Sequence, residues 1–281
     1  MLTSTQELLE KARKYSYAVG AFNLYNLEGA KAVVNAAESD NSPAIIQILP
    51  HILKYGGPPL IALLLEAADS ASVPMSVHLD HCEEPAIIEA ALEAGIQSVL
   101  ADGSKFSYRE NLDFTREMTA LAHAKGATVE AEIGRISGTE DGMTVAEKEA
   151  KMTDPNQAKE FVAASKVDFL AVTIGNVHGQ YYSEPRLDFD RLAQGRQRLA
   201  IPLVLHGASG LPALMIQRSI ELGVCKFNVN TEVRQKYLQF WREYGKTDAK
   251  TDLLDCQKAA TSAMQEIIAQ KIRLFGSAGK A

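Results

Sequence analysis

Short apolar segments alternate with amphipathic segments along the whole chain. Eight runs rich in β-branched and apolar residues predict buried strands at 16–22, 44–49, 75–80, 98–102, 128–134, 169–175, 203–207 and 226–231. Patterns with helical period lie at 27–39, 56–71, 84–94, 108–125, 155–165, 186–199, 212–222 and 232–244. Strict alternation of this kind predicts an α/β fold, a (β/α)8 TIM barrel formed by a single domain over residues 1–281. A further helix near 253–274 predicts a C-terminal helical extension.

Proline and glycine mark the ends of several predicted helices. Pro85, Pro155 and Pro212 stand near helix starts, where a missing N–H is tolerated. Gly95 and Gly223 directly follow helices and suit a left-handed C-cap. The alternative fold is a doubly wound open sheet, but no GxGxxG follows the first strand to favour it.

Composition narrows the class of protein. A chain of 281 residues with 46% hydrophobic and 23% charged residues is globular. The net charge of −6 argues against nucleic acid as a partner. Three cysteines with no CxxC do not make a disulfide framework, and the longest apolar stretch, 58–68, is too short to span a bilayer. The N-terminus is polar, with no signal-peptide core, so we expect a cytoplasmic protein without a membrane partner.

Three of the six histidines stand at the ends of separate predicted strands. His81 follows strand 75–80, His178 follows strand 169–175, and His206 lies at the end of strand 203–207. TIM barrels place their chemistry at the carboxyl ends of the strands, and three imidazoles are the ligand set of a catalytic zinc site. The alternative is that each is a hydrogen-bonded core or rim residue. Of the other histidines, we expect His78 in the core or in contact with a metal ligand, and His51 and His123 in solvent.

Carboxylates accompany these histidines. Asp80 directly precedes His81, and a carboxylate beside a metal-bound substrate can transfer a proton, although it could instead orient a ligand histidine. Asp102 and Glu132 also lie at strand ends. They are candidates for a secondary metal position, and pairing with Lys or Arg is the alternative.

Glycine-rich turns follow the last two predicted strands. They read GASG at 207–210 and NVNT at 228–231, with Gly179 in the preceding loop. These are the loops from which TIM barrels build phosphate sites. A further polar segment, 134–151, is long and contains three glycines, so we expect a lid with Glu140 at its tip, and a solvated surface loop is the alternative.

The motifs together resemble a known family. HLDH (78–81), DGS (102–104), VEAEIGRISGTEDG (129–142), GNVHG (175–179), LVLHGASG (203–210) and KFNVNTE (226–232) are similar to those of class II, zinc-dependent ketose-bisphosphate aldolases. The family includes fructose- and tagatose-bisphosphate aldolases, and the resemblance covers almost the whole chain. It implies a lyase of carbohydrate metabolism, such as glycolysis, that cleaves a phosphorylated ketose into dihydroxyacetone phosphate, or a close analogue, and an aldehyde.

The resemblance also implies roles for individual residues. His81, His178 and His206 would hold Zn²⁺, and Asp80 would exchange a proton with the C4 hydroxyl. Glu140 would exchange one with carbon. The implied substrate contacts are Gly179, Gly207, Ser209, Asn228, Asn230 and Thr231. A monovalent cation (Na⁺ or K⁺) near these loops and assembly as a homodimer or homotetramer are further family expectations.

Two local departures and three alternatives remain. Asn230 stands where relatives carry a small residue or Asp, and Cys82 with two glutamates replaces a glycine or serine turn after His81. The substrate could be another phosphorylated ketose or a keto acid. A class I aldolase would need a lysine pointing into the barrel, and we place Lys226 at the amino-terminal face of its strand. The other alternative is a non-catalytic binding barrel.

Overall fold

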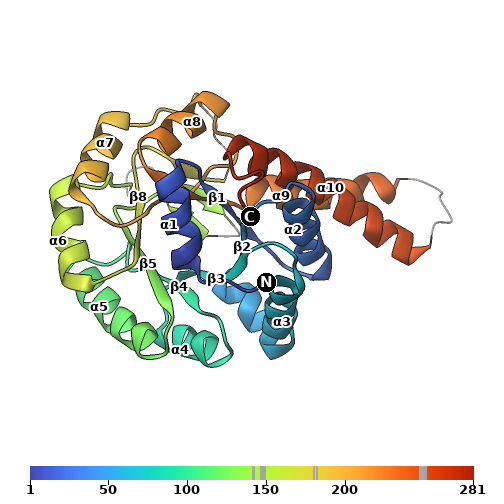
Figure 1. Cartoon of the computed structure of the whole chain (residues 1–281), viewed down its shortest axis with the longest axis horizontal. Helices are drawn as coiled ribbons and strands as arrows, with labels where there is room; N and C mark the ends of the chain where they lie inside the picture. The colour runs from blue at the N-terminus through green and yellow to red at the C-terminus, as the bar shows by residue number, and fades with distance from the viewer. Residues whose placement is uncertain (141–142, 146–149, 180, 182, 247–251) are drawn as a thin grey trace.

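Eight parallel strands close into a barrel, as the alternation predicted (Figure 1). The computed structural model describes residues 1–140, 143–145, 150–179, 181, 183–246 and 252–281, with only the backbone of 139, 140 and 143–145. The order around the barrel is β1-β11-β10-β8-β5-β4-β3-β2. The strands are β1 (Val19–Asn23), β2 (Ala44–Ile48), β3 (Met75–Cys82), β4 (Ser98–Ala101), β5 (Thr128–Ile133), β8 (Phe169–Val172), β10 (Leu203–Leu205) and β11 (Val224–Val229).

Helices surround this barrel, and all except α1 lie at predicted places. They are α1 (Thr5–Tyr15), α2 (Leu27–Ser39), α3 (Pro50–Ser70), α4 (Pro85–Glu93), α5 (Tyr108–Ala124), α6 (Pro155–Ser165), α7 (Phe189–Arg198), α8 (Ala213–Glu221), α9 (Thr231–Tyr244) and α10 (Leu253–Leu274). Gly95 and Gly223, which follow α4 and α8, have φ of 102° and 98°, so both adopt the left-handed conformation that was predicted for them. α3 begins earlier than predicted because its helical residues continue across a break at Gly57, before two prolines.

Apolar side chains fill the amino-terminal half of the barrel interior. Val19, Ile45, Phe169 and Val204 pack there in one buried cluster with Leu9 of α1. In Figure 1, α1 lies across the barrel, and its chain leads into the amino end of β1. A second, larger cluster joins the outer faces of the strands to the helices. Buried carboxylates of the strands, such as Asp80 and Glu132, lie toward the carboxyl ends, where the site is found.

The polar segment after β5 contains regular structure. β6 (Ser137–Glu140) pairs antiparallel with β7 (Met143–Val145) and parallel with β9 (Val177–His178). Part of the expected lid is therefore a hairpin joined by hydrogen bonds to the strand that carries His178. Thr139 and Glu140 extend a strand whose close approach to β9 depends on Gly138, where a Cβ would lie 2.1 Å from the carbonyl oxygen of His178.

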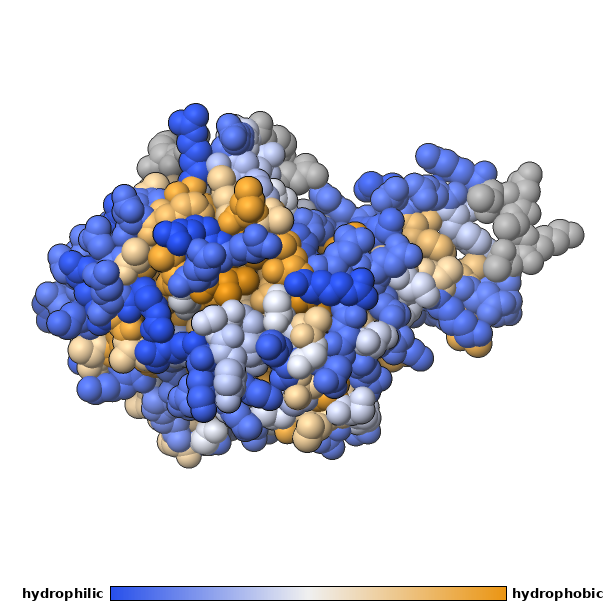
Figure 2. Space-filling model, turned by 45° about the horizontal axis from the view of Figure 1, so that its top comes forward, coloured by the Kyte–Doolittle hydropathy of each residue, from blue (hydrophilic) through white to orange (hydrophobic). Residues whose placement is uncertain are grey.

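The last two helices form an arm that projects from the barrel (Figure 1). Leu238 of α9 and Leu253 and Leu254 of α10 expose 43%, 67% and 57% of their surface. Hydrophobic surface is visible on this arm in Figure 2. Among the described residues, none of the helices is both long and apolar enough to cross a bilayer.

Candidate metal and catalytic site

The three histidines predicted at strand ends converge. His81 lies in β3, His178 in β9, and His206 directly after β10. Their ring centroids are 5.1 Å (His81–His178), 4.7 Å (His81–His206) and 6.0 Å (His178–His206) apart. One nitrogen from each ring lies within 4.8 Å of the others. The fold thus brings together residues that lie 28 to 125 positions apart in the chain.

The remaining ring atoms explain how the imidazoles are oriented. His81 Nδ1 lies 2.7 Å from Asp102 Oδ2, which leaves its Nε2 for another ligand. His206 Nε2 lies 2.8 Å from Glu130 Oε1, which leaves its Nδ1. Histidines that bind metals are held in this manner through their second nitrogen.

Several polar atoms at the centre of this cluster are buried without a hydrogen-bond partner among the described residues. They are His178 Nε2, His206 Nδ1 and Glu132 Oε2, the last 3.3 Å from His206 Nδ1. Buried polar atoms without partners cost free energy, so their clustering points to an absent ligand. His178 Nε2, His206 Nδ1, His81 Nε2 and a carboxylate oxygen of Glu132 are donors that suit Zn²⁺. The residues present therefore fit a zinc ion.

Charges in the cluster differ from one histidine to the next. Burial, and next the neighbouring His81, hold the pKa of His178 well below its usual value, so His178 is neutral. Burial opposes a charge on His81 too, but Asp80 and Asp102 raise the pKa of His81 to about 10. The negative field that holds a proton there also favours a divalent cation, which would compete with that proton.

A backbone irregularity lets two consecutive residues, Asp80 and His81, both reach the site. Successive side chains of a regular strand point to opposite faces. Here Leu79 pairs with Val99 and Cys82 with Ala101, so three steps along β3 face two along β4. His81 has a φ of 45°, which is uncommon outside glycine. Strained backbone of this kind is concentrated at functional sites.

Asp80 is buried and held by two amides. Its Oδ2 accepts a hydrogen bond from Asn23 Nδ2 at 2.8 Å, and its Oδ1 accepts one from Asn228 Nδ2 at 3.0 Å. Burial alone would raise the pKa of the Asp80 carboxyl, but His81 and Lys226 lower it, so the group is ionised at neutral pH. The arrangement provides a fixed proton acceptor beside the histidine cluster.

The carboxylates predicted as secondary ligands also lie at the cluster. Oxygens of Asp102 and Glu132 form a second group with His81 whose ligand atoms lie within 4.8 Å of one another. Asp102 Oδ1 accepts from the backbone N–H of Ser104 at 3.0 Å. Burial opposes ionisation of Asp102, but its hydrogen bond to His81 holds its pKa well below the usual value.

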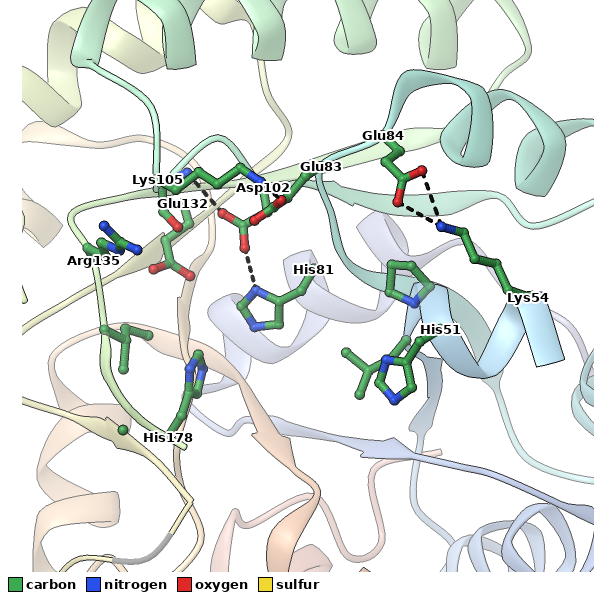
Figure 3. Close-up of a pocket in the computed structure, with 15 residues that line it drawn as sticks. His51, Lys54, His81, Glu83, Glu84, Asp102, Lys105, Glu132, Arg135 and His178 are labelled. Carbon is green, nitrogen blue, oxygen red and sulfur yellow. Dashed lines mark hydrogen bonds and ion pairs between the residues drawn. The ribbon is translucent and has the colours of Figure 1, made fainter. Parts of the chain in front are cut away.

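The cluster opens into a cavity of about 450 Å³. Figure 3 shows His81, His178, Asp102 and Glu132 on one side and Lys54 and Glu84 on the other. Lys54 pairs with Glu84 at 2.9 Å, and Lys105 pairs with Glu83. These two glutamates are the departure noted after His81, and they place ion pairs at the mouth of the cavity. His51 also lines the cavity, whereas His123 bonds to Asp168 on the surface.

The predicted substrate residues lie beside the histidines but do not line this cavity. Ser209, Asn228, Asn230 and Thr231 are buried at the ends of β10 and β11. α9 begins at Thr231, and the Asn230 side chain makes no capping bond to it, since its Oδ1 accepts from the Tyr25 hydroxyl at 2.8 Å. Gly179 and Gly207 have φ of 85° and 67°. The side chain of Glu140 lies outside the described part of the chain.

One expectation was wrong, and one residue was missed. β11 begins at Val224, two residues before its predicted start, so Lys226 lies within the strand with a fully buried side chain. It is not at the amino-terminal face, and its Nζ bonds to Glu130 and Asn228. Asn23, which holds Asp80, was not singled out. Asn23 is the last residue of β1, and this position at the carboxyl end of a barrel strand could have indicated a role in the site.

Comparison with known proteins agrees with this architecture. Residues 3–280 match the family model described as fructose-bisphosphate aldolase class-II. A putative fructose-1,6-bisphosphate aldolase from Coccidioides immitis is 38% identical over 98% of this chain and 97% of its own, with a TM-score of 0.92. The YdjI aldolase from Escherichia coli K12 is 35% identical over 100% of both chains, with a TM-score of 0.90.

A more distant structure shares the fold. Fructose-bisphosphate aldolase from Campylobacter jejuni is 22% identical over 100% of this chain and 97% of its own, with a TM-score of 0.84. The fold and the family match define a TIM-barrel lyase. The chain belongs to the class II fructose-bisphosphate aldolase family, and its activity is that of an aldolase.

Proposed function

We propose that this aldolase depends on zinc and cleaves a phosphorylated ketose, similar to fructose or tagatose 1,6-bisphosphate, into dihydroxyacetone phosphate, or a close analogue, and an aldehyde. The observation that carries the proposal is the convergence of His81, His178 and His206, with buried nitrogens that lack partners in the described chain, beside the ionised Asp80. Zinc held by these histidines would supply Lewis-acid stabilisation of the negative charge that develops on the ketone oxygen.

The side chains of the protein would carry out the proton transfers. Asp80, fixed by Asn23 and Asn228, accepts the proton of the C4 hydroxyl as the carbon–carbon bond breaks. Glu140 then returns a proton to carbon from the end of β6, beside the strand of His178. Because two amides hold Asp80, little reorganisation precedes its proton transfer.

The loops after β10 and β11 would bind the phosphate. Gly179, Gly207 and Ser209 offer backbone N–H groups and a hydroxyl, and Asn230 and Thr231 lie at the start of α9, where backbone N–H groups and the helix dipole favour an anion. A monovalent cation, Na⁺ or K⁺, near these loops is part of the proposal. Asn228 would act chiefly through Asp80, to which its amide is bonded.

The class I alternative is disfavoured by the contacts of the one barrel lysine that we considered for it. Lys226 Nζ donates to Glu130 Oε2 and to Asn228 Oδ1, both at 2.8 Å. A Schiff-base lysine must be neutral and reach the substrate carbonyl, whereas a buried ammonium with a carboxylate partner stays charged.

A direct test measures zinc and cleavage in the same variants. His178→Ala should bind zinc more weakly and lose cleavage while it stays folded, because it removes one ligand. His123→Ala is the matched control, since His123 lies on the surface. A His178→Ala protein with wild-type zinc content and activity would contradict the proposal. Cleavage across a panel of phosphorylated ketoses would identify the substrate.

Assembly as a homodimer or homotetramer is also proposed. Exposed leucines on the α9–α10 arm support it, because contiguous apolar surface on a soluble chain marks contact with another protein.

A further inference from the structure

Lys226 occupies the centre of a buried polar network below the histidine cluster. Its side chain is fully buried in the barrel, and its Nζ donates to Glu130 Oε2 and to Asn228 Oδ1, each at 2.8 Å. Charged side chains are almost never fully buried unless they are paired. The mechanism proposed above does not use this lysine.

Two branches lead from Lys226 to the reacting groups. Through Asn228, whose Nδ2 lies 3.0 Å from Asp80 Oδ1, it reaches the proton acceptor. Through Glu130, whose Oε1 lies 2.8 Å from His206 Nε2, it reaches a proposed zinc ligand. All four of these partner side chains are buried.

The direction of each hydrogen bond follows from the donors that an ammonium carries. Lysine has donors only, so the Asn228 atom that faces it must be the oxygen, and the NH₂ must face Asp80. A carboxylate accepts only, so Glu130 keeps the proton of His206 on Nε2. His206 Nδ1 faces the cluster, where it lies 3.3 Å from Glu132 Oε2.

We propose that Lys226 is the positioning residue that orients both halves of the site, the Asn228 amide that holds Asp80 and the Glu130 carboxylate that fixes the tautomer of His206. The inference rests on the proposed function for the identity of these two halves. One buried lysine would thus couple proton transfer to metal binding, and it would do so without touching the substrate.

The alternative is a purely structural ion pair that fills the barrel. Lys226→Met separates the two, because methionine nearly matches the shape but has no donor. Ile45→Ala is the control: Ile45 is buried in the apolar half of the same barrel, so its truncation destabilises the fold without touching the network. We expect Ile45→Ala to lower the melting temperature but to keep zinc affinity and turnover.

For Lys226→Met, the measurements are the zinc dissociation constant, by chelator competition, and kcat and KM. We expect the zinc dissociation constant to rise about 10- to 100-fold, the usual effect of losing an outer-shell partner. We expect kcat to fall at least about tenfold while KM changes less than about threefold, because Lys226 does not bind substrate. The proposal would be overturned if the zinc dissociation constant, kcat and KM of Lys226→Met all lay within about twofold of those of Ile45→Ala.

Double variants test the two branches separately. If Lys226 acts through Glu130, adding Lys226→Met to Glu130→Gln weakens zinc binding no further. If Lys226 acts through Asn228, adding Lys226→Met to Asn228→Ala lowers kcat no further. Full additivity on both branches would refute the coupling.

Should Lys226→Met not fold, the single variants still decide. Glu130→Gln is expected to weaken zinc binding, and Asn228→Ala to lower kcat with zinc affinity retained. The reverse pattern, or no effect in either variant, would overturn the proposal. Other measurements would show that the proposed function itself is wrong. These are normal zinc binding by His178→Ala, or no zinc binding by the wild-type protein.

Discussion

Gly207→Ala should disrupt the histidine cluster although it removes no functional atom. Gly207 follows His206 with a φ of 67°, and a Cβ there would lie 2.1 Å from the carbonyl oxygen of Val177, the neighbour of His178. The methyl group requires this separation to grow from 2.1 Å to at least 3.0 Å. Either His206 or His178 must move with its backbone.

The magnitude follows from two contributions. The left-handed conformation costs a residue with a Cβ about 1–2 kcal/mol. Displacement by about 1 Å at a reacting centre lowers turnover by about 10²-fold. We therefore expect modest destabilisation, zinc affinity lowered by about tenfold or more through the displaced ligand, and a fall of about 10²-fold in kcat.

Gly126→Ala is the matched control. Gly126 has a φ of 73°, but its Cβ would meet nothing within 4 Å, so this variant carries the conformational cost alone. Zinc titration, steady-state cleavage and thermal unfolding would be measured for both variants. Zinc affinity and turnover of Gly207→Ala within about threefold of Gly126→Ala would refute the reasoning, because the contact with Val177 would then not determine where the histidines lie.

Three further outcomes are expected. Asp80→Asn should retain zinc but lose about 10²–10⁴-fold in kcat, since a positioned proton acceptor is removed, and a change of less than about threefold in steady-state cleavage would make Asp80 an orienting residue only. Burial, and next Lys226, lower the pKa of His78 from 6.5 to about 3. Between these values the unfolded chain binds a proton at His78 that the folded chain excludes. Lowering the pH through this range therefore reduces the free energy of unfolding by up to about 1.4 kcal/mol per pH unit. Urea denaturation from about pH 6.5 to about pH 4.5 should show a weaker dependence in His78→Gln than in the wild type, and equal slopes would contradict this. Replacing Leu253 and Leu254 with Ser should reduce the molar mass measured by light scattering if the arm holds an oligomer together, and an unchanged oligomer would exclude these contacts.

Local patterns determined the barrel and the position of its chemistry. Each strand is a short apolar run and each helix an amphipathic one, because burial imposes these periods on nearby residues. The carboxyl ends of parallel strands meet at one face, so His81, His178 and His206 could be expected to converge from their places in the chain. The family motifs carried the expected activity, which membership of the aldolase family confirms.

Contacts inside the barrel were decided by tertiary structure. Lys226 was misplaced because a shift of two residues in where β11 begins changes its position in the barrel, and no local pattern fixes that boundary. The irregularity between Leu79 and Cys82 lets Asp80 and His81 share a site, and it exists only where β3 meets β4. Hydrogen bonds such as that from Asn23 to Asp80 depend on the register around the closed barrel. The apolar pattern of a sequence indicates which segments are buried, whereas closure of the sheet decides which buried residues meet.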